Sequence, residues 1–277
     1  MLDVRISCQP GDPGRPNEDS VVAVPGLLAV LDGVTVPDGT DTGCVHGPAW
    51  YSAHLAAQLA RGYTAEPAAD LAELVAAGIE AVRGKHGSDC DLTHPATPQS
   101  TLAMLRIGPE RCDYLLLGDS TVVLDCGGMI EAVADLRSHE VARRVRGPAR
   151  RSPIGSGEHE QRVRDELDAV RAYLNRPGGY WLAAADPAAA RHAVRGSAAR
   201  SGPQALERTA LLTDGASCVV DSYHLTDWAG LLDLIQAHGT ARIVELARDV
   251  ERADPQGREH RRPKLHDDAT VAYCRLR

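Results

Sequence analysis

Segments with strand-forming sequences and segments with helix-forming sequences occur in groups along this chain and do not alternate strictly. Strict alternation is typical of a doubly wound parallel sheet, whereas grouped strands are typical of antiparallel sheets. The grouping therefore predicts an α+β fold, in which residues 101–126 form a three-stranded antiparallel meander. The expected strands are residues 4–8, 20–24, 27–31, 101–107, 112–117, 121–126, 180–185, 207–212 and 269–276.

Other segments repeat apolar residues at intervals of three and four, which is the pattern of a helix with one buried face. One further short helix is expected to be capped by Ser138 and to run to Arg146. Residues 187–194 begin with a proline near the first helical position, which favours a helix start. The expected helices are residues 50–59, 71–82, 138–146, 158–174, 187–194, 228–235 and 243–250.

Composition limits the class of protein. The 277 residues, 43% of them hydrophobic and 25% charged, suit a soluble globular protein. No apolar run reaches the roughly 18 residues of a membrane span, and the N-terminus does not resemble a secretory signal. A net charge of −8 argues against a general nucleic-acid binder. The seven cysteines contain no CxxC pair, so reduced thiols in a cytoplasm are expected rather than disulfides or a zinc ribbon.

Aspartates stand at the ends of the expected strands. Asp32 and Asp214 each end an apolar strand and precede glycine, Asp19 directly precedes a strand, and Asp267 and Asp268 precede the last one. Carboxylates gathered at strand ends repel one another unless cations lie between them. A set of oxygen ligands without a Cys/His pattern favours Mg²⁺ or Mn²⁺ over zinc or copper. A single Asp-Gly pair is an ordinary turn, but four such sites in one chain favour a metal centre.

Six short motifs follow one another in a fixed order: Arg15–Ser20, Leu31–Gly33, Ser100–Leu102, Gly118–Ser120, Leu212–Gly215 and Asp267–Thr270. This series resembles the PPM family, the metal-dependent serine/threonine protein phosphatases of type 2C, and is most similar to the bacterial branch. The resemblance runs from about residue 4 to about residue 275. It implies two antiparallel sheets packed as a sandwich with helices on both outer faces (αββα, four layers). It also implies a single phosphatase domain over residues 1–277, with a flap region at residues 147–179.

The resemblance implies hydrolysis of phosphate monoesters, above all phosphoserine and phosphothreonine in proteins, by water activated at a binuclear Mg²⁺ or Mn²⁺ centre. Asp32 would bridge the two ions, the Gly33 carbonyl would bind one of them, and Asp214 and Asp267 would complete the other.

Further residues of the same motifs surround that centre. Glu18 and Asp19 would orient waters of the ions, and Asp268 joins the expected metal ligands. Arg15 would hold the substrate phosphate, because a planar guanidinium matches phosphate oxygens.

The chain departs from the family pattern at two places. Relatives carry a histidine just after the Asp-Gly of the second motif, where it is thought to protonate the leaving group. Here the chain has Val34–Thr35, so His46 is the candidate catalytic replacement, with a structural role as the alternative. Relatives also carry an aspartate where this chain has Cys218. A third ion, bound partly by Asp119, is therefore left open, because Asp119 also suits a turn.

Two arginine-rich groups also lie near these motifs. The first belongs to the flap region and would either recruit an acidic phosphosubstrate or form a solvated basic face. The second has the same alternative of a solvated basic face, but it leads directly into Asp267, which favours a role near the site. The two groups are Arg143, Arg144, Arg146, Arg150 and Arg151, and then Arg258, His260, Arg261, Arg262 and Lys264.

Two other functions compete with a protein phosphatase. One is a phosphomonoesterase that acts on a small metabolite with the same metals. The other is a pseudophosphatase that binds a partner without turnover, although a dead site has no reason to keep a self-repelling cluster. The expected partner is a phosphorylated protein or a small phosphate ester, with no nucleic acid and no membrane, and the expected state is a monomer.

Overall fold

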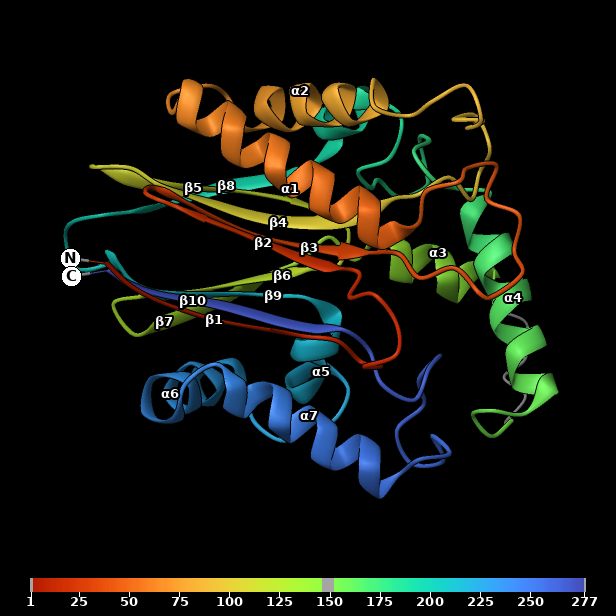
Figure 1. The fold of residues 1–277 in the computed structure, drawn as a ribbon. Coiled ribbons are helices and arrows are strands. Elements are labelled where there is room, and N and C mark those ends of the chain that lie inside the picture. The colour runs from red at the N-terminus through yellow and green to blue at the C-terminus, as the bar shows by residue number, and fades with distance from the viewer. Residues whose placement is uncertain (1, 146–151, 277) are drawn as a thin grey trace.

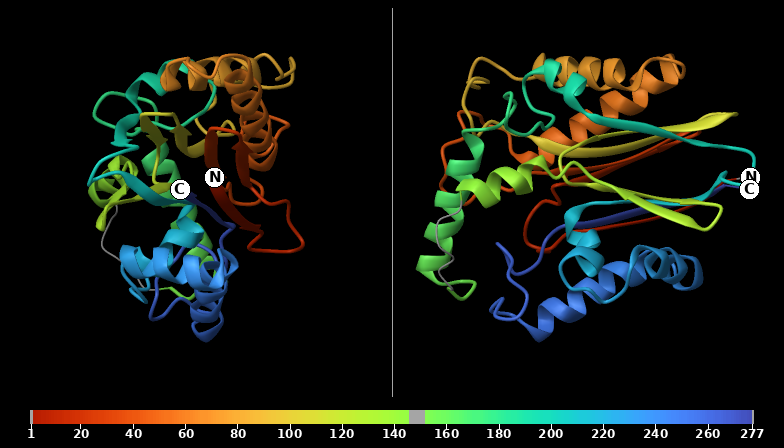
Figure 2. Two further views of the ribbon diagram at one scale, coloured as in Figure 1. Left: turned by 90° about the vertical axis from the view of Figure 1, so that its left-hand side faces the viewer. Right: turned by 180° about the vertical axis from the view of Figure 1, so that it is seen from behind.

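Two antiparallel five-stranded sheets pack face to face, and helices cover both outer faces (Figures 1 and 2). This four-layer αββα sandwich confirms the predicted fold class. The structure is a computed structural model that describes residues 2–145 and 152–276. No helix in these described ranges is long and apolar enough to cross a membrane.

Each sheet combines strands that are distant in the sequence. The first sheet contains, in spatial order, β1 (Leu2–Gln9), β10 (Ala269–Leu276), β9 (Leu206–Leu212), β6 (Thr121–Cys126) and β7 (Met129–Val133). The second sheet contains β2 (Asp19–Val24), β3 (Leu27–Gly33), β4 (Ser100–Ile107), β5 (Arg111–Leu117) and β8 (Val194–Ala199). Because β1 pairs with β10, both termini lie at the same end of the sandwich (Figure 1).

The helices form two outer layers and one end group (Figure 1). The second sheet is covered by α1 (Pro48–Ala65) and α2 (Leu71–Arg83), and the 3-10 helix η1 (Pro187–His192) packs beside α2. The first sheet is covered by α5 (Asp214–Asp221), α6 (Trp228–His238) and α7 (Ala241–Ala253). The end group, α3 (Arg137–Val145) and α4 (Gly157–Arg171), stands at the end opposite the termini.

Alternate residues of the central strands face different layers of the core. In β3, Val30 lies in the apolar layer between the sheets, and its neighbour Leu31 lies in the layer beneath α1 and α2. Both faces are therefore buried, which explains why β3 reads as a continuous apolar run rather than an alternating one. Leu212 and Val271 belong to the third layer, beneath α5, α6 and α7.

The predicted three-stranded meander over residues 101–126 is wrong. β4 and β5 pair in the second sheet, but β6 pairs with β7 and β9 in the first. The chain crosses between the sheets at Gly118, which has a φ of 76° and where a Cβ atom would lie 2.6 Å from Leu182 and 2.9 Å from Thr101. In the sequence, this crossing between the sheets has the same residues as a hairpin turn. Only the pairing of β6 with β7 and β9 shows that it is a crossing.

Two more local predictions are wrong. The expected strand at residues 180–185 is a buried extended segment that forms only the isolated bridges Leu174↔Tyr180 and Ser100↔Ala183. Ser138 is the second residue of α3 and does not cap it. The Asp135 carboxylate precedes this helix and accepts the Arg137 N–H at 3.3 Å. The expected helix end, Arg146, lies outside the described residues.

Three elements were not predicted. The strands β7 and β8 lie at the edges of their sheets and have no fully buried residue, so their apolar pattern is weak. The helix α5 begins at the Asp-Gly pair, which in sequence indicates a turn.

Candidate metal centre

Strands from both sheets bring the predicted aspartates to one end of the sandwich. Asp19 begins β2 and is the register partner of Asp32 near the end of β3. Asp214 begins α5, separated from β9 by Thr213, and Asp267 is separated from β10 by Asp268. The backbone N–H of Thr213 donates to the carbonyl of Thr270 at 3.1 Å, which joins these last two segments.

Charge and desolvation act together on these carboxyl groups. Burial, followed by the charges of Asp214 and Asp19, raises the pKa of Asp32 well above its usual range. Burial and the charge of Asp267 raise the pKa of Asp214 to about 7. Asp19 is buried, with 5% exposure, whereas Asp214 is an exposed residue, although desolvation of its carboxyl group beside the other carboxylates still raises its pKa. The cluster therefore holds more negative charge than its surroundings stabilise, and it requires protons or cations.

The donor set fits divalent cations. Every predicted ligand is an oxygen, which is the preference of Mg²⁺ and Mn²⁺. Asp19 Oδ1 is buried and has no hydrogen-bond partner among the described residues, whereas its other oxygen accepts the Thr213 hydroxyl at 2.9 Å. An unpaired carboxylate oxygen in a buried position is suited to an ion or its water.

Lys264 is the cation that the chain itself places in the cluster. Its Nζ lies 2.5 Å from Asp267 Oδ1 and donates to Thr35 Oγ1 at 2.6 Å. Burial opposes the charged form, but Asp267 and Asp32 outweigh burial and raise the pKa of Lys264. The Thr35 hydroxyl donates in turn to the Glu18 carboxylate. Lys264 belongs to the basic group that sequence placed near the site, whereas Thr35 was noted only as part of the departure from the family.

Asp268 fastens the loop between β1 and β2. Its Oδ1 accepts the N–H of Gly11 at 2.7 Å, and its Oδ2 accepts the N–H of Glu18 at 2.6 Å. A Cβ atom on Gly11 would lie 2.7 Å from the backbone of Asp267, so this close approach requires glycine. The role of Asp268 as a metal ligand stays a prediction. Its hydrogen bonds to Gly11 and Glu18 also position the loop that carries Arg15.

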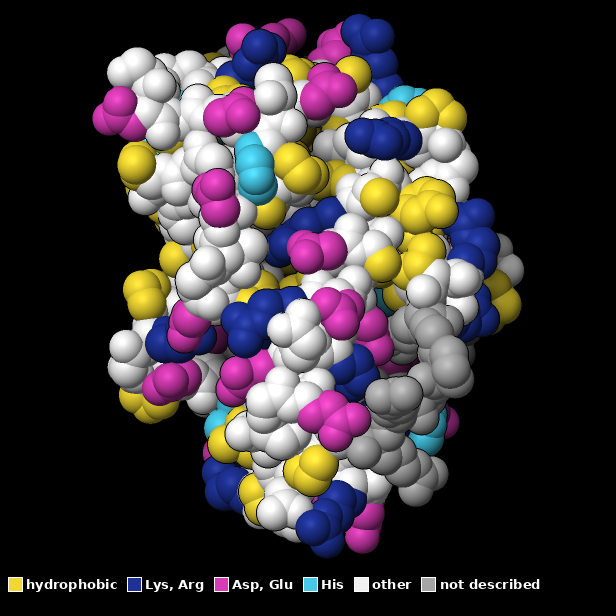
Figure 3. Space-filling model, turned by 90° about the vertical axis from the view of Figure 1, so that its right-hand side faces the viewer, with side chains coloured by type: hydrophobic (Ala, Val, Ile, Leu, Met, Phe, Trp, Pro, Cys, Tyr) yellow, Lys and Arg dark blue, Asp and Glu magenta, His cyan; other side chains and the backbone are white. Residues whose placement is uncertain are grey.

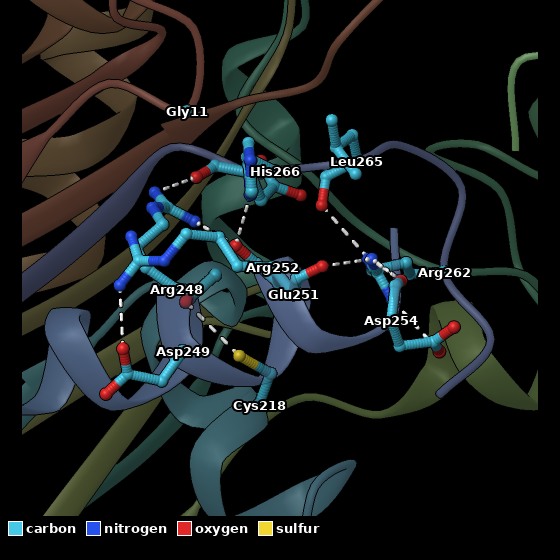
Figure 4. A network of polar contacts seen from close by, with 12 residues as sticks. Gly11, Cys218, Arg248, Asp249, Glu251, Arg252, Asp254, Arg262, Leu265 and His266 are labelled. Carbon is cyan, nitrogen blue, oxygen red and sulfur yellow. Dashed lines mark hydrogen bonds and ion pairs between the residues drawn. The ribbon is translucent and has the colours of Figure 1, made fainter. Parts of the chain in front are cut away.

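A polar network centred on Glu251 contacts the backbone of Asp267 (Figure 4). Glu251, on α7, is 2% exposed and accepts hydrogen bonds from Arg248 at 2.8 Å and from His266 at 2.6 Å. Arg248 also donates to the carbonyl of Asp267. Arg262 donates to the carbonyls of Glu251 and Leu265, at 3.2 and 3.0 Å. These bonds hold the segment that carries Lys264 and Asp267 against α7.

Arg15 lies on the loop before Asp19 and is exposed. Its guanidinium pairs with Asp38 at 3.1 Å, and its charge lowers the pKa of Glu18, although burial leaves that pKa raised overall. Arg164 of α4 donates to the Asp38 carbonyl at 3.3 Å. Arg15 therefore stands at the rim of the carboxylate cluster, beside the described part of the flap region.

Asp119 and His139 form a pair near Asp214. Asp119 Oδ2 is 2.8 Å from His139 Nε2, and the Asp119 charge adds to the raised pKa of Asp214. His139 belongs to α3, so this helix contacts the site. The Sγ of Cys218, where relatives carry an aspartate, donates to the carbonyl of Gly215 at 3.2 Å.

His46 lies just before α1 and stacks on Trp50, with 3.8 Å between the ring centroids. Its ring also meets His86 edge to face at 5.2 Å. The leaving-group role of His46 stays a prediction.

The flap region is described from residue 152 onward and contains α4. Arg146, Arg150 and Arg151, and residues 147–151 of the flap region, lie outside the described residues. On the face at this end, basic and acidic side chains are interspersed (Figure 3). Arg143 and Arg144, with Arg137 and Trp181, line a hollow of about 590 Å³ beside α3.

Residues 12–246 match the model of the family described as protein phosphatase 2C. The match covers more than half of the chain, and the chain therefore belongs to this family of phosphatases. No curated protein matches the sequence.

Solved structures of bacterial phosphatases share the fold. The catalytic domain of PstP in complex with two manganese ions is 21% identical, with a TM-score of 0.56 and coverage of 99% of this chain and 97% of that one. The Mycobacterium tuberculosis phosphatase PstP/Ppp is 20% identical, with a TM-score of 0.58 and coverage of 99% and 98%. MsPP from Mycobacterium smegmatis, in complex with cacodylate, is 19% identical, with a TM-score of 0.57 and coverage of 99% and 98%.

Proposed function

We propose that this protein hydrolyses phosphate monoesters, above all phosphoserine and phosphothreonine in proteins, with two Mg²⁺ or Mn²⁺ ions. The whole chain would form one phosphatase domain. The observation that carries the proposal is the carboxylate cluster, which strands of both sheets assemble and in which the pKa of each of the four aspartates is raised. The four residues are Asp19, Asp32, Asp214 and Asp267.

The ions would be held by Asp32, the Gly33 carbonyl, Asp214 and Asp267, with Glu18 and Asp19 on their waters. When bound, such cations supply Lewis acidity, which lowers the pKa of water and neutralises charge on phosphoryl oxygens. A Cβ atom at Gly33 would lie 2.9 Å from the Glu18 carbonyl, so glycine permits this close backbone contact.

The protein's own side chains would bind and orient the substrate. Arg15 at the rim offers a planar guanidinium to the phosphate. Lys264 orients Asp267 and the Thr35 hydroxyl, which holds Glu18 in place. The exposed Arg143 and Arg144 stand on the same helix as His139 and supply positive charge for a phosphoprotein. His46→Ala kinetics across pH would test its predicted proton donation to the leaving group.

Turnover of an aryl phosphate in Mn²⁺, Mg²⁺ and EDTA tests the activity. Activity that requires Mn²⁺ or Mg²⁺ supports the proposal, and a protein that binds the metals without turnover is a pseudophosphatase. A panel of phosphopeptides and phosphorylated metabolites then tests the substrate class. A strong preference for the metabolites would replace protein phosphate with a small phosphate ester.

We expect Arg15→Ala to lower kcat/KM by ~10- to 100-fold, because a charge-assisted hydrogen bond to phosphate contributes roughly 1.5–3 kcal/mol. The loss should appear mainly in KM, since the phosphate is charged in the ground state and in the transition state. Steady-state kinetics on a phosphopeptide and an aryl phosphate measure it. Arg83→Ala is the control, because Arg83 is exposed and pairs with Glu80 on α2. A change within twofold on both substrates would mean that Arg15 does not bind the phosphate.

We expect Lys264→Met to destabilise the metal-free protein by roughly 1–3 kcal/mol and to tighten Mn²⁺ binding. The ammonium neutralises the carboxylates when no ion is bound, and it repels an ion that enters. Thermal unfolding in EDTA and Mn²⁺ titration calorimetry measure the two effects. Lys85→Met is a matched control, because Lys85 is the only other lysine of the chain and is exposed. Weaker Mn²⁺ binding in Lys264→Met would contradict this account.

A further inference from the structure

Two loops on the α1 and α2 side of the molecule bring two cysteines and a histidine together. Cys44 lies on the loop between β3 and α1, whereas His86 and Cys90 lie on the loop between α2 and β4. Cys44 Sγ is 3.0 Å from Cys90 Sγ and 3.4 Å from His86 Nδ1. Within residues 2–145 and 152–276, this is the one trio of Cys, His, Asp or Glu side chains whose ligand atoms all lie within 4.8 Å of one another. The aspartates of the phosphatase site are thus in a more open arrangement.

The chemistry of this trio differs from that of the aspartate cluster. Two thiolates and one imidazole form a ligand set that selects zinc, and tetrahedral zinc sites commonly combine these donors. In such a site, bonds of about 2.3 Å to sulfur place the two sulfur atoms roughly 3.7 Å apart. A small outward movement of both thiols, which are half-buried on loops, reaches that separation from 3.0 Å. The adjacent imidazole distinguishes this group from a simple pair of cysteines.

The surroundings of the trio complete a binding site. The backbone N–H of His46 donates to Cys44 Sγ at 3.4 Å, and such N–H to sulfur bonds support a metal-bound thiolate. The His46 ring, stacked on Trp50, flanks His86. This leaves His46 or a water as the fourth ligand.

The site joins two segments that have little regular structure. The N–H of Asp91 donates to the carbonyl of Gly43 at 2.6 Å, which places the loops side by side (Figure 1). The loop that contains Cys44 also contains Thr35 and Asp38, and these residues contact Glu18 and Arg15. A metal that fixes this loop would therefore also fix the rim of the phosphatase site.

We propose that Cys44, His86 and Cys90 bind one Zn²⁺ ion, which fastens the β3–α1 loop to the α2–β4 loop and is distinct from the Mg²⁺ or Mn²⁺ centre. The ion is structural, because it is bound by residues outside the aspartate cluster and links two loops. Zinc content is measured without turnover, so a failure to bind zinc and a failure of the proposed phosphatase activity are distinguishable.

Zinc content of the purified protein tests the proposal. After dialysis without a chelator, we expect elemental mass spectrometry to find about one zinc per chain in the wild-type protein. We expect less than about a tenth of that in Cys44→Ser and in Cys90→Ser. Cys126→Ser is the matched control and should keep the zinc, because Cys126 lies at the end of β6. Asp32→Asn should also keep it. Zinc that is lost with Asp32→Asn and kept with Cys90→Ser would belong to the aspartates and would overturn the proposal.

If the cysteine variants do not fold, X-ray absorption spectroscopy of the zinc in the wild-type protein identifies its ligands directly. We expect two sulfur ligands at about 2.3 Å and nitrogen at about 2.0–2.1 Å. Replacement of one nitrogen by oxygen in His46→Ala would identify His46 as the fourth ligand, and an unchanged shell would identify water. A shell of oxygen only, or a Cys44–Cys90 disulfide in protein purified without oxidant, would overturn the proposal.

Discussion

Asp32→Asn should lower kcat/KM by at least about a hundredfold, or ~3 kcal/mol of transition-state stabilisation, and leave the fold intact. Asp32 is the residue proposed to bridge both ions. Its replacement would therefore weaken the binding of both ions, and with it the neutralisation of charge on the phosphoryl oxygens. The variant should also be at least as stable as the wild type without metal. Burial and the charges of Asp214 and Asp19 raise the pKa of Asp32, and an amide removes that repulsion.

The measurements are steady-state kinetics with Mn²⁺ and thermal unfolding in EDTA. Asp125→Asn is the control at another strand end. Asp125 is 4% exposed and pairs with Arg208 at 2.7 Å, so its loss should lower stability and leave the metal dependence of activity unchanged. Activity of Asp32→Asn close to that of the wild type would rule out the proposed centre.

The metal-free protein should become less stable as pH rises from about 4 to about 7. The folded-state pKa of each cluster aspartate is raised above that of the unfolded chain, and that of Asp214 lies at about 7. At a pH between the pKa of an aspartate in the unfolded chain and its raised pKa in the folded protein, the folded protein holds a proton that the unfolded chain has released. Raising the pH through this range therefore favours unfolding. The free energy of unfolding then falls by about 1.4 kcal/mol per pH unit for each full proton of difference.

Saturating Mn²⁺ should remove most of this slope, because the ions require deprotonated carboxylates, so the metal-bound folded protein no longer holds protons that the unfolded chain has released. Denaturant unfolding at a series of pH values, with Mn²⁺ and with EDTA, measures both slopes. Asp214→Asn should flatten the EDTA slope near neutral pH, and the exposed Asp12→Asn should not. Equal slopes with and without Mn²⁺ would contradict a metal-binding role for the cluster.

The fold class followed from local signals that the sequence carries directly. Strands buried on both faces, such as β3, are continuous apolar runs, and their order in groups distinguishes antiparallel sheets from a parallel one. The positions of the aspartates at strand ends could also be predicted from the sequence. A strand such as β3 ends at a defined residue, so the position of Asp32 in the sequence fixes its position at the edge of the sheet.

The local patterns of the sequence therefore predicted an α+β fold with antiparallel sheets, and the αββα layers followed only from the resemblance to the PPM family. The sequence also proposed the aspartate cluster. Only the tertiary structure decided that β6 joins the first sheet and that Lys264 and Thr35 enter the cluster. It alone also brought Cys44 to His86 and Cys90 across 42 and 46 positions. The physical reason is that spacing along the chain reports neighbours on one strand or helix. Contacts between loops depend on how the layers pack around them.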